Sequence, residues 1–135
     1  LNIEKYVIFT GPERISDEDA LRLLATADVC VHPDPLNPLN DKSTMNKMME
    51  YMALGKPIVS YDLTEARFSA NEAAIYATPN DELDFAKNVI HLFNHPDLRS
   101  RMGKYGKKRV TEKLAWKYSV PSLLKAYSYV LGREK

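Results

Sequence analysis

Short apolar segments alternate with amphipathic helical segments along most of this chain, and this alternation restricts the fold more than any other feature. The segments predicted as strands are rich in β-branched and aromatic residues and are bounded by glycine, proline or polar residues: 5–10, 28–32, 57–61 and 73–77. Strands that alternate with helices pair in parallel, and their apolar character on both faces is typical of a sheet covered by helices. The sequence therefore predicts an α/β fold with a parallel sheet.

The helices between these strands have recognisable start and stop signals. Ser16 is a good N-cap, and three acidic residues follow it. Ser43 or Thr44 is predicted to cap a second helix, which Gly55 ends. Further segments are predicted as follows: a polar loop over 62–71, a helix capped by Asn80 or Asp81, a basic helix from His95-Pro96 to about Glu112, and a last helix up to Gly132.

Length and composition exclude several classes of protein. The 135 residues carry a net charge of +1, which argues against a protein that coats polyanions. The single cysteine, Cys30, excludes an internal disulfide and a cysteine zinc cluster, and we expect it to lie inert in the core. No apolar run reaches the roughly 20 residues of a membrane helix. These features predict one soluble globular domain, or part of one, with no metal site.

A proline-rich loop over 33–42 leads into the second helix and is the most unusual segment. Ligands of open parallel sheets bind beyond the carboxyl ends of the strands, where this loop is expected. The free backbone amides at the helix start would form a site for an anion such as phosphate: Ser43, Thr44, Met45 and Asn46. Asn46 and Glu50 lie one turn apart, and a carboxylate suits a ribose diol. On composition alone, a surface ion pair between Lys47 and Glu50 is the favoured alternative.

Residues 46–59 read NKMMEYMALGKPIV, and this segment resembles the signature of the retaining glycosyltransferases of family 4, which have the GT-B fold. Weaker matches occur in the same order and spacing at 9–11, 27–29, 32–35, 80–81 and 114–116, so the resemblance covers nearly the whole chain. It is closest in kind to bacterial enzymes of surface-polysaccharide synthesis.

The resemblance implies a nucleotide-sugar donor, usually a UDP- or GDP-sugar, bound by a Rossmann-like C-terminal domain. The second glutamate of the family motif contacts the ribose and matches Glu50. The first glutamate falls at Lys42, so this chain departs from the motif at the usual sugar contact. A lysine there cannot accept a hydrogen bond from a sugar hydroxyl, although it suits a diphosphate. No cofactor is implied.

The resemblance also implies that residues 1–135 are a partial donor-binding domain, with C-terminal helices from about 97 to 132. The first two strands of the family's domain, its glycine-rich turn and its basic clamp have no counterpart here, and neither has the acceptor domain. Because the chain has no initiator Met, we expect the natural protein to begin further upstream, and removal of the Met or processing is the alternative. In the Rossmann strand order, the absent strands would lie between residues 5–10 and 28–32. Exposed strand edges invite pairing, so we expect rearrangement, a strand-swapped dimer or an edge-paired dimer.

Other residues have functional and structural interpretations that stay open. His32 follows a strand at the ligand edge, and it either contacts the donor or acceptor or bonds to backbone. Glu65 and Arg67 lie in the loop where the family places a donor-site glutamate, and a loop ion pair is the alternative. A basic stretch favours a solvated helix face first and an anionic membrane surface second, with nucleic acid disfavoured: Arg99, Arg101, Lys104, Lys107, Lys108, Arg109, Lys113 and Lys117.

Two functions from different classes follow. The first is a fragment of a retaining glycosyltransferase of hexosyltransferase type that acts on a glycan or lipid-linked acceptor, cytoplasmic or at the inner face of the membrane. The isolated fragment is expected to be inactive, because half of the donor clamp and all of the acceptor site are missing. The resemblance assigns no catalytic residue to this chain. The second is a non-catalytic α/β module that binds a nucleotide or phosphosugar.

Overall fold

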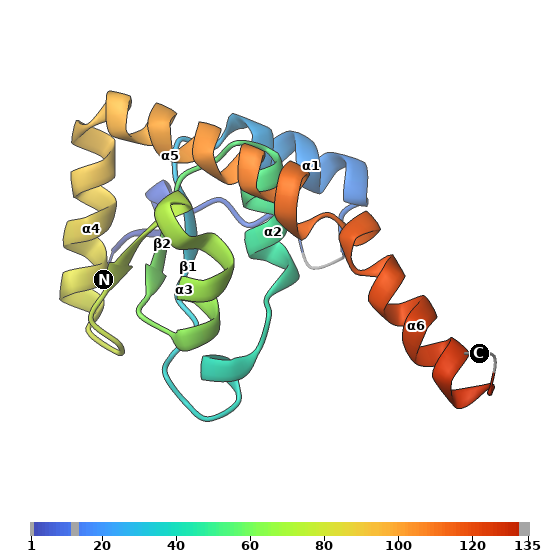
Figure 1. The fold of residues 1–135 in the computed structure, drawn as a ribbon. Helices are drawn as coiled ribbons and strands as arrows, with labels where there is room; N and C mark the ends of the chain where they lie inside the picture. The colour runs from blue at the N-terminus through green and yellow to red at the C-terminus, as the bar shows by residue number, and fades with distance from the viewer. Residues whose placement is uncertain (1, 12–13, 133–135) are drawn as a thin grey trace.

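Three short parallel strands form the centre of the molecule. The computed structural model describes residues 2–11 and 14–132. The strands are β1 (Cys30–His32), β2 (Ile58–Tyr61) and β3 (Ala74–Ala77), in the order β1-β2-β3 (Figure 1). In the register of the sheet, Val31 pairs with Val59, which in turn pairs with Ile75. The predicted α/β fold with a parallel sheet is confirmed.

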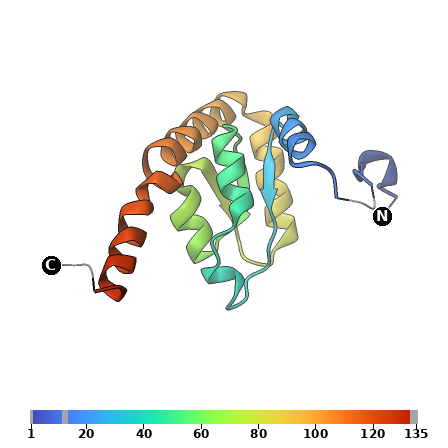
Figure 2. The ribbon, with the colours of Figure 1, turned by 90° about the vertical axis from the view of Figure 1, so that its right-hand side faces the viewer.

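Helices cover both faces of the sheet. Helices α2 (Asn46–Ala53) and α3 (Thr64–Ala70) lie on one face, and α4 (Glu82–Asn94) lies on the other (Figure 2). Helix α5 (Pro96–Arg109) crosses the amino ends of the strands, and α1 (Asp17–Thr26) precedes β1. Helix α6 (Val120–Val130) extends away from this body (Figure 1). Shorter helical turns occupy Glu4–Tyr6, Asn40–Lys42, Asn71–Ala73, Val110–Leu114 and Trp116–Tyr118.

The core lies between the sheet and these helices. Met48 and Met52 of α2 are buried against β2 and α3, and Leu92 and Met102 are buried with Val59 on the other face. Met48 and Met52 are therefore part of the core. Cys30 is buried in β1, and burial raises the pKa of its thiol to about 11, so the thiol stays protonated at neutral pH.

The N-terminal strand predicted over residues 5–10 is wrong. Residues Glu4–Tyr6 form a helical turn, and 7–10 form no helix or strand and pair with no described strand. Ile8 is 92% exposed and Phe9 is 87% exposed. A β-prone segment becomes a strand only when a neighbour accepts its hydrogen bonds, and no described strand lies beside this one.

Several local predictions are confirmed and others are corrected. The side chains of Ser16 and Asp81 accept N-cap hydrogen bonds from Asp19 and Asp84, and Gly55 has a φ of 70° at the end of α2. The segment predicted as a loop over 62–71 contains helix α3 instead. The basic helix ends at Arg109, where a π-turn follows it, rather than near Glu112. In the part of the chain that the structure describes, no helix is long and apolar enough to cross a bilayer.

Candidate functional site

The loop after β1 and the first turns of α2 and α3 meet at the carboxyl edge of the sheet (Figure 2). Side chains hold this loop in one conformation. The Asn37 carboxamide oxygen accepts hydrogen bonds from the amides of Leu39 and Asn40, at 3.0 and 2.9 Å. From the end of β3, Asn80 accepts a hydrogen bond from the Leu36 amide at 2.7 Å. These side-chain hydrogen bonds therefore hold the loop, which contains one short helical turn, in a defined conformation.

Asp41 joins this loop to α3. Its carboxylate accepts hydrogen bonds from the amide of Thr64 at 2.8 Å and from the hydroxyl of Thr64 at 3.0 Å. Thr64 is the first residue of α3, so a carboxylate 23 positions earlier satisfies a helix-start amide at the positive end of the helix dipole. The starts of α2 and α3 are thus fixed against the same loop.

Helix α2 begins without a side-chain cap. The cap predicted at Ser43 or Thr44 is wrong: the N-cap residue is Met45, and its side chain cannot accept a hydrogen bond. The Ser43 hydroxyl donates to the Leu39 carbonyl at 2.6 Å, and the Thr44 hydroxyl donates to Glu65 at 2.8 Å. Both polar side chains hold the loop instead of capping the helix.

The missing cap leaves backbone donors unused at the start of α2. The Ser43 amide donates to Asn40 at 3.4 Å, so this predicted phosphate ligand already has an acceptor. Among the described residues, we find no acceptor for the amides of Thr44, Met45 and Asn46. These amides lie at the positive end of α2, where an anion would be stabilised.

Glu50 and Asn46 lie one turn apart on α2, and both are exposed. Within the described part of the chain, neither side chain makes a hydrogen bond or an ion pair. Lys47 bonds to Asp34, so the alternative of a Lys47–Glu50 surface pair is wrong. Lys42 is also exposed, at the end of the turn that precedes α2. The exposed carboxylate and amide side chains can therefore reach a ligand held at the helix start.

Glu65 and Arg67, the other predicted loop residues, are engaged within α3 and its neighbours. Glu65 accepts hydrogen bonds from Thr44 at 2.8 Å and from Ser69 at 2.9 Å. Arg67 donates two hydrogen bonds of 2.6 Å to Asp62, and this contact lowers the pKa of the Asp62 carboxyl. The Arg67 guanidinium also lies 4.4 Å from the centre of the Tyr76 ring. Glu65 thus lies beside the uncapped start of α2, whereas Arg67 is bound to Asp62.

His32 lies inside the protein, beneath the loop. It is 1% exposed, and its Nδ1 atom lies 2.9 Å from the Ser60 hydroxyl. Its Nε2 atom lies 3.2 Å from Asp34, in an orientation that makes no hydrogen bond. Burial lowers the pKa of His32, and the nearby Asp34 charge only partly opposes this effect. The sequence leaves open whether His32 contacts a ligand or bonds within the protein, and the structure places its Nδ1 atom against Ser60.

Asp34 receives a cation from α2. Its carboxylate accepts hydrogen bonds from the Lys47 ammonium at 2.8 and 2.9 Å. Burial alone would raise the pKa of Asp34, but the hydrogen bond from Lys47 and the neighbouring charges lower it overall. The sequence analysis missed this pair and the cap from Asp41. Two features of the sequence could have indicated the Asp34–Lys47 pair: Asp34 lies two residues after a strand, and Lys47 lies in the first turn of a helix.

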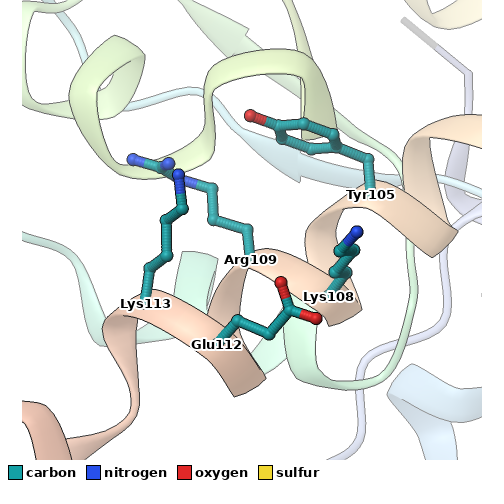
Figure 3. A pocket seen from close by; sticks show the side chains of 5 residues that line it. All are labelled: Tyr105, Lys108, Arg109, Glu112 and Lys113. Atoms are coloured by element: carbon teal, nitrogen blue, oxygen red, sulfur yellow. The ribbon is translucent and has the colours of Figure 1, made fainter.

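A separate hollow of about 310 Å³ lies along α5 and the turn that follows it (Figure 3). Its lining residues are Tyr105, Lys108, Arg109, Glu112 and Lys113. Arg109 donates hydrogen bonds to the carbonyls of Phe68 and Ser69 at the end of α3. This hollow lies away from the starts of α2 and α3. Among the described residues, no group of three or more potential metal ligands occurs.

Comparisons with known proteins bear on the fold and the family of the chain. No curated protein is significantly similar to the chain in sequence. The structure of sucrose-phosphate synthase from Thermosynechococcus elongatus matches with a TM-score of 0.83 and 22% identity, and the match covers 98% of this chain and 32% of that one. The chain therefore has the fold of part of a GT-B glycosyltransferase and spans about a third of that relative. A family model described as glycosyl transferases group 1 matches residues 1–95. The chain belongs to the glycosyl transferases group 1 family.

Proposed function

We propose that this chain is the later part of the donor-binding domain of a retaining glycosyltransferase. The observation that carries the proposal is the uncapped start of α2, where the amides of Thr44, Met45 and Asn46 have no described acceptor and the exposed Glu50 lies one turn after Asn46. Backbone amides at a helix start suit phosphate, and a carboxylate one turn away suits the hydroxyls of ribose. A nucleoside diphosphate has both groups.

In this proposal, the chain contributes binding and charge rather than a reacting group. The amides of Thr44, Met45 and Asn46 face the diphosphate of a UDP- or GDP-sugar, and Lys42 adds a positive charge. Stabilising the departing diphosphate lowers the barrier to sugar transfer, because negative charge develops there as the glycosidic bond breaks. Ser43 contributes less than the sequence predicts, since its amide bonds to Asn40. No cofactor is required beyond the donor substrate.

The proposed whole enzyme transfers a hexose to a glycan or lipid-linked acceptor in bacterial surface-polysaccharide synthesis. Its acceptor domain would lie upstream, and the isolated chain would not turn over a donor. Exposed basic residues of α5 and the turns after it support a peripheral contact with anionic lipid at the inner face of the membrane. Examples are Lys104, Lys107 and Lys113. Such a contact would bring the donor site close to a lipid-linked acceptor.

Calorimetric titration with UDP and with GDP tests the donor site. We expect the wild-type chain to bind one of them, and Glu50→Gln to weaken that binding by roughly 10- to 100-fold, the value of a hydrogen bond to a charged group. Glu112→Gln is the matched control, because Glu112 is exposed and lies after α5, away from this site. A wild-type chain that binds neither nucleotide at millimolar concentration would contradict the proposal, as would an unchanged affinity for Glu50→Gln.

A further inference from the structure

Lys47 occupies an unfavourable place for a cation. It is the second residue of α2, within the first turn, where the positive end of the helix dipole repels a positive charge. No side chain caps this end. A lysine at this position needs a compensating anion, and Asp34 supplies one through two hydrogen bonds of 2.8 and 2.9 Å.

Asp34 is itself held from the sheet. Asp34 lies two residues after His32, the last residue of β1. The buried His32 side chain lies against the Asp34 carboxylate, with 3.2 Å between His32 Nε2 and Asp34 Oδ2. On the other side of the imidazole, Nδ1 lies 2.9 Å from the Ser60 hydroxyl. That hydroxyl donates to the Tyr61 carbonyl at 2.8 Å. Ser60 is completely buried in β2. The Asp34 carboxylate therefore packs against side chains that are buried in the sheet.

This arrangement links the sheet to the helix start across the loop. We propose that Lys47 and Asp34, supported by His32, are positioning residues that hold the first turn of α2 and its uncapped amides in place for a diphosphate. Asn46, whose amide is one of the unused donors, is the direct neighbour of Lys47. The proposal rests on the proposed function for its ligand, but the positioning itself does not require a ligand.

Hydrogen exchange measures the positioning without any nucleotide. In Lys47→Met, we expect the amides of residues 48–50, which are hydrogen-bonded in the first turns of α2, to exchange about tenfold faster than in the wild-type chain, because the ion pair with Asp34 is lost. Lys47→Arg restores the ion pair and should restore slow exchange. If Lys47 acted only through the helix dipole, removing its charge would strengthen the helix and slow exchange, which is the opposite sign. Slower or unchanged exchange in Lys47→Met would overturn the proposal.

Two further variants test whether the change in exchange comes from loss of the Lys47–Asp34 ion pair rather than from unfolding or from a change in net charge. Asp34→Asn keeps the size of the side chain and removes its charge, so it should accelerate exchange of the same amides if Lys47→Met does. Lys87→Met removes a charge from the exposed face of α4, on the other side of the sheet, and should leave the exchange of the amides of residues 48–50 unchanged. Equal acceleration in Lys87→Met would also overturn the proposal, since the effect would then come from net charge.

Nucleotide binding separates positioning from a direct contact. We expect Lys47→Met and Asp34→Asn each to raise the dissociation constant for UDP or GDP about tenfold. If Lys47 instead contacts phosphate directly, Asp34→Asn would free its ammonium group, and the variant would bind the nucleotide as tightly as the wild-type chain or more tightly. That result would contradict a positioning role. If the wild-type chain binds neither nucleotide, the proposed function fails. The exchange experiment then still decides whether the Lys47–Asp34 ion pair holds the first turn of α2.

Discussion

At the residue scale, His32 is the group whose protonation the fold opposes most clearly. It is 1% exposed, and burial lowers its pKa from the ordinary value of 6.5. The unfolded chain therefore binds a proton at a pH where the folded chain does not. Stability is fully present above pH 6.5 and decreases as the pH falls towards the folded-state pKa. We expect the free energy of unfolding to decrease by about 1.4 kcal/mol per pH unit in this window.

Urea unfolding between pH 7.5 and 5 checks this pH dependence. His32→Asn keeps a polar side chain beside Ser60 and lacks a titrating group, so most of the dependence should disappear in this variant. The carboxyls of Asp34 and Asp62 do not confuse the result, because their pKa values are lowered from 3.8 and they titrate at lower pH. The same slope in His32→Asn and in the wild-type chain would exclude His32 as its source.

The residues that sequence reasoning located correctly are those whose role depends on near neighbours. Ser16 and Asp81 cap the helices that directly follow them, and spacing alone brings Asn46 and Glu50 to one exposed side of α2. The role of Lys47 could not be assigned in this way. Its partner Asp34 lies 13 positions earlier, and only the return of the loop to the end of β1 brings the two together.

At the element scale, helices α2 and α5 are packed so closely that a single methyl group would separate them. A Cβ atom added at Gly103 would lie 2.0 Å from the Gly55 carbonyl oxygen, and this neighbour is backbone that cannot rotate away. Gly55 is itself constrained by a φ of +70° at the end of α2. The contact fixes the end of α2 against α5.

We expect Gly103→Ala to reduce the free energy of unfolding by about 1–3 kcal/mol, the usual cost of overpacking. Alanine normally favours a helix over glycine, so propensity alone predicts stabilisation. Ser100→Ala, on the exposed side of α5, should change stability by no more than about 0.5 kcal/mol. Thermal unfolding of both variants decides between packing and propensity. A Gly103→Ala chain as stable as the wild type would show that the helices can move apart without cost.

Two elements differ from the sequence prediction because their determinants lie elsewhere in the chain. Helix α3 was predicted as a loop, yet Leu63, Ala66 and Ala70 have helical spacing and are buried. Its start lacks a local cap, since Asp41 supplies the carboxylate from another segment. The segment over 5–10 has the composition of a strand but no described neighbour to pair with. Composition indicates what a segment can form, and its neighbours decide whether it does.

At the scale of the whole molecule, both outer strands of the sheet, β1 and β3, have an edge that no described strand pairs with. Strand β1 pairs only with β2 among the described strands, so its other edge has no partner. Between the loop after β1 and helix α4, an apolar hollow of about 420 Å³ is lined by residues that include Pro33, Phe85 and Ile90. Unpaired backbone groups beside apolar surface are a template for another strand.

We therefore expect the chain to form dimers through the free edge of β1, with residues 5–10 or a second β1 as the added strand. The Cys30 amide donates to Pro57 at 3.0 Å, so the alternation along the strand directs the Val31 amide to the free edge. Val31→Pro removes that one donor without removing a bond to β2, and should weaken dimerisation about tenfold or more, measured by sedimentation velocity across a concentration series. Val31→Ala keeps the donor and trims the side chain, so it should dimerise like the wild type if the backbone edge is responsible. A wild-type chain that stays monomeric at every concentration, or a folded Val31→Pro chain that dimerises equally well, would rule out this edge as the interface.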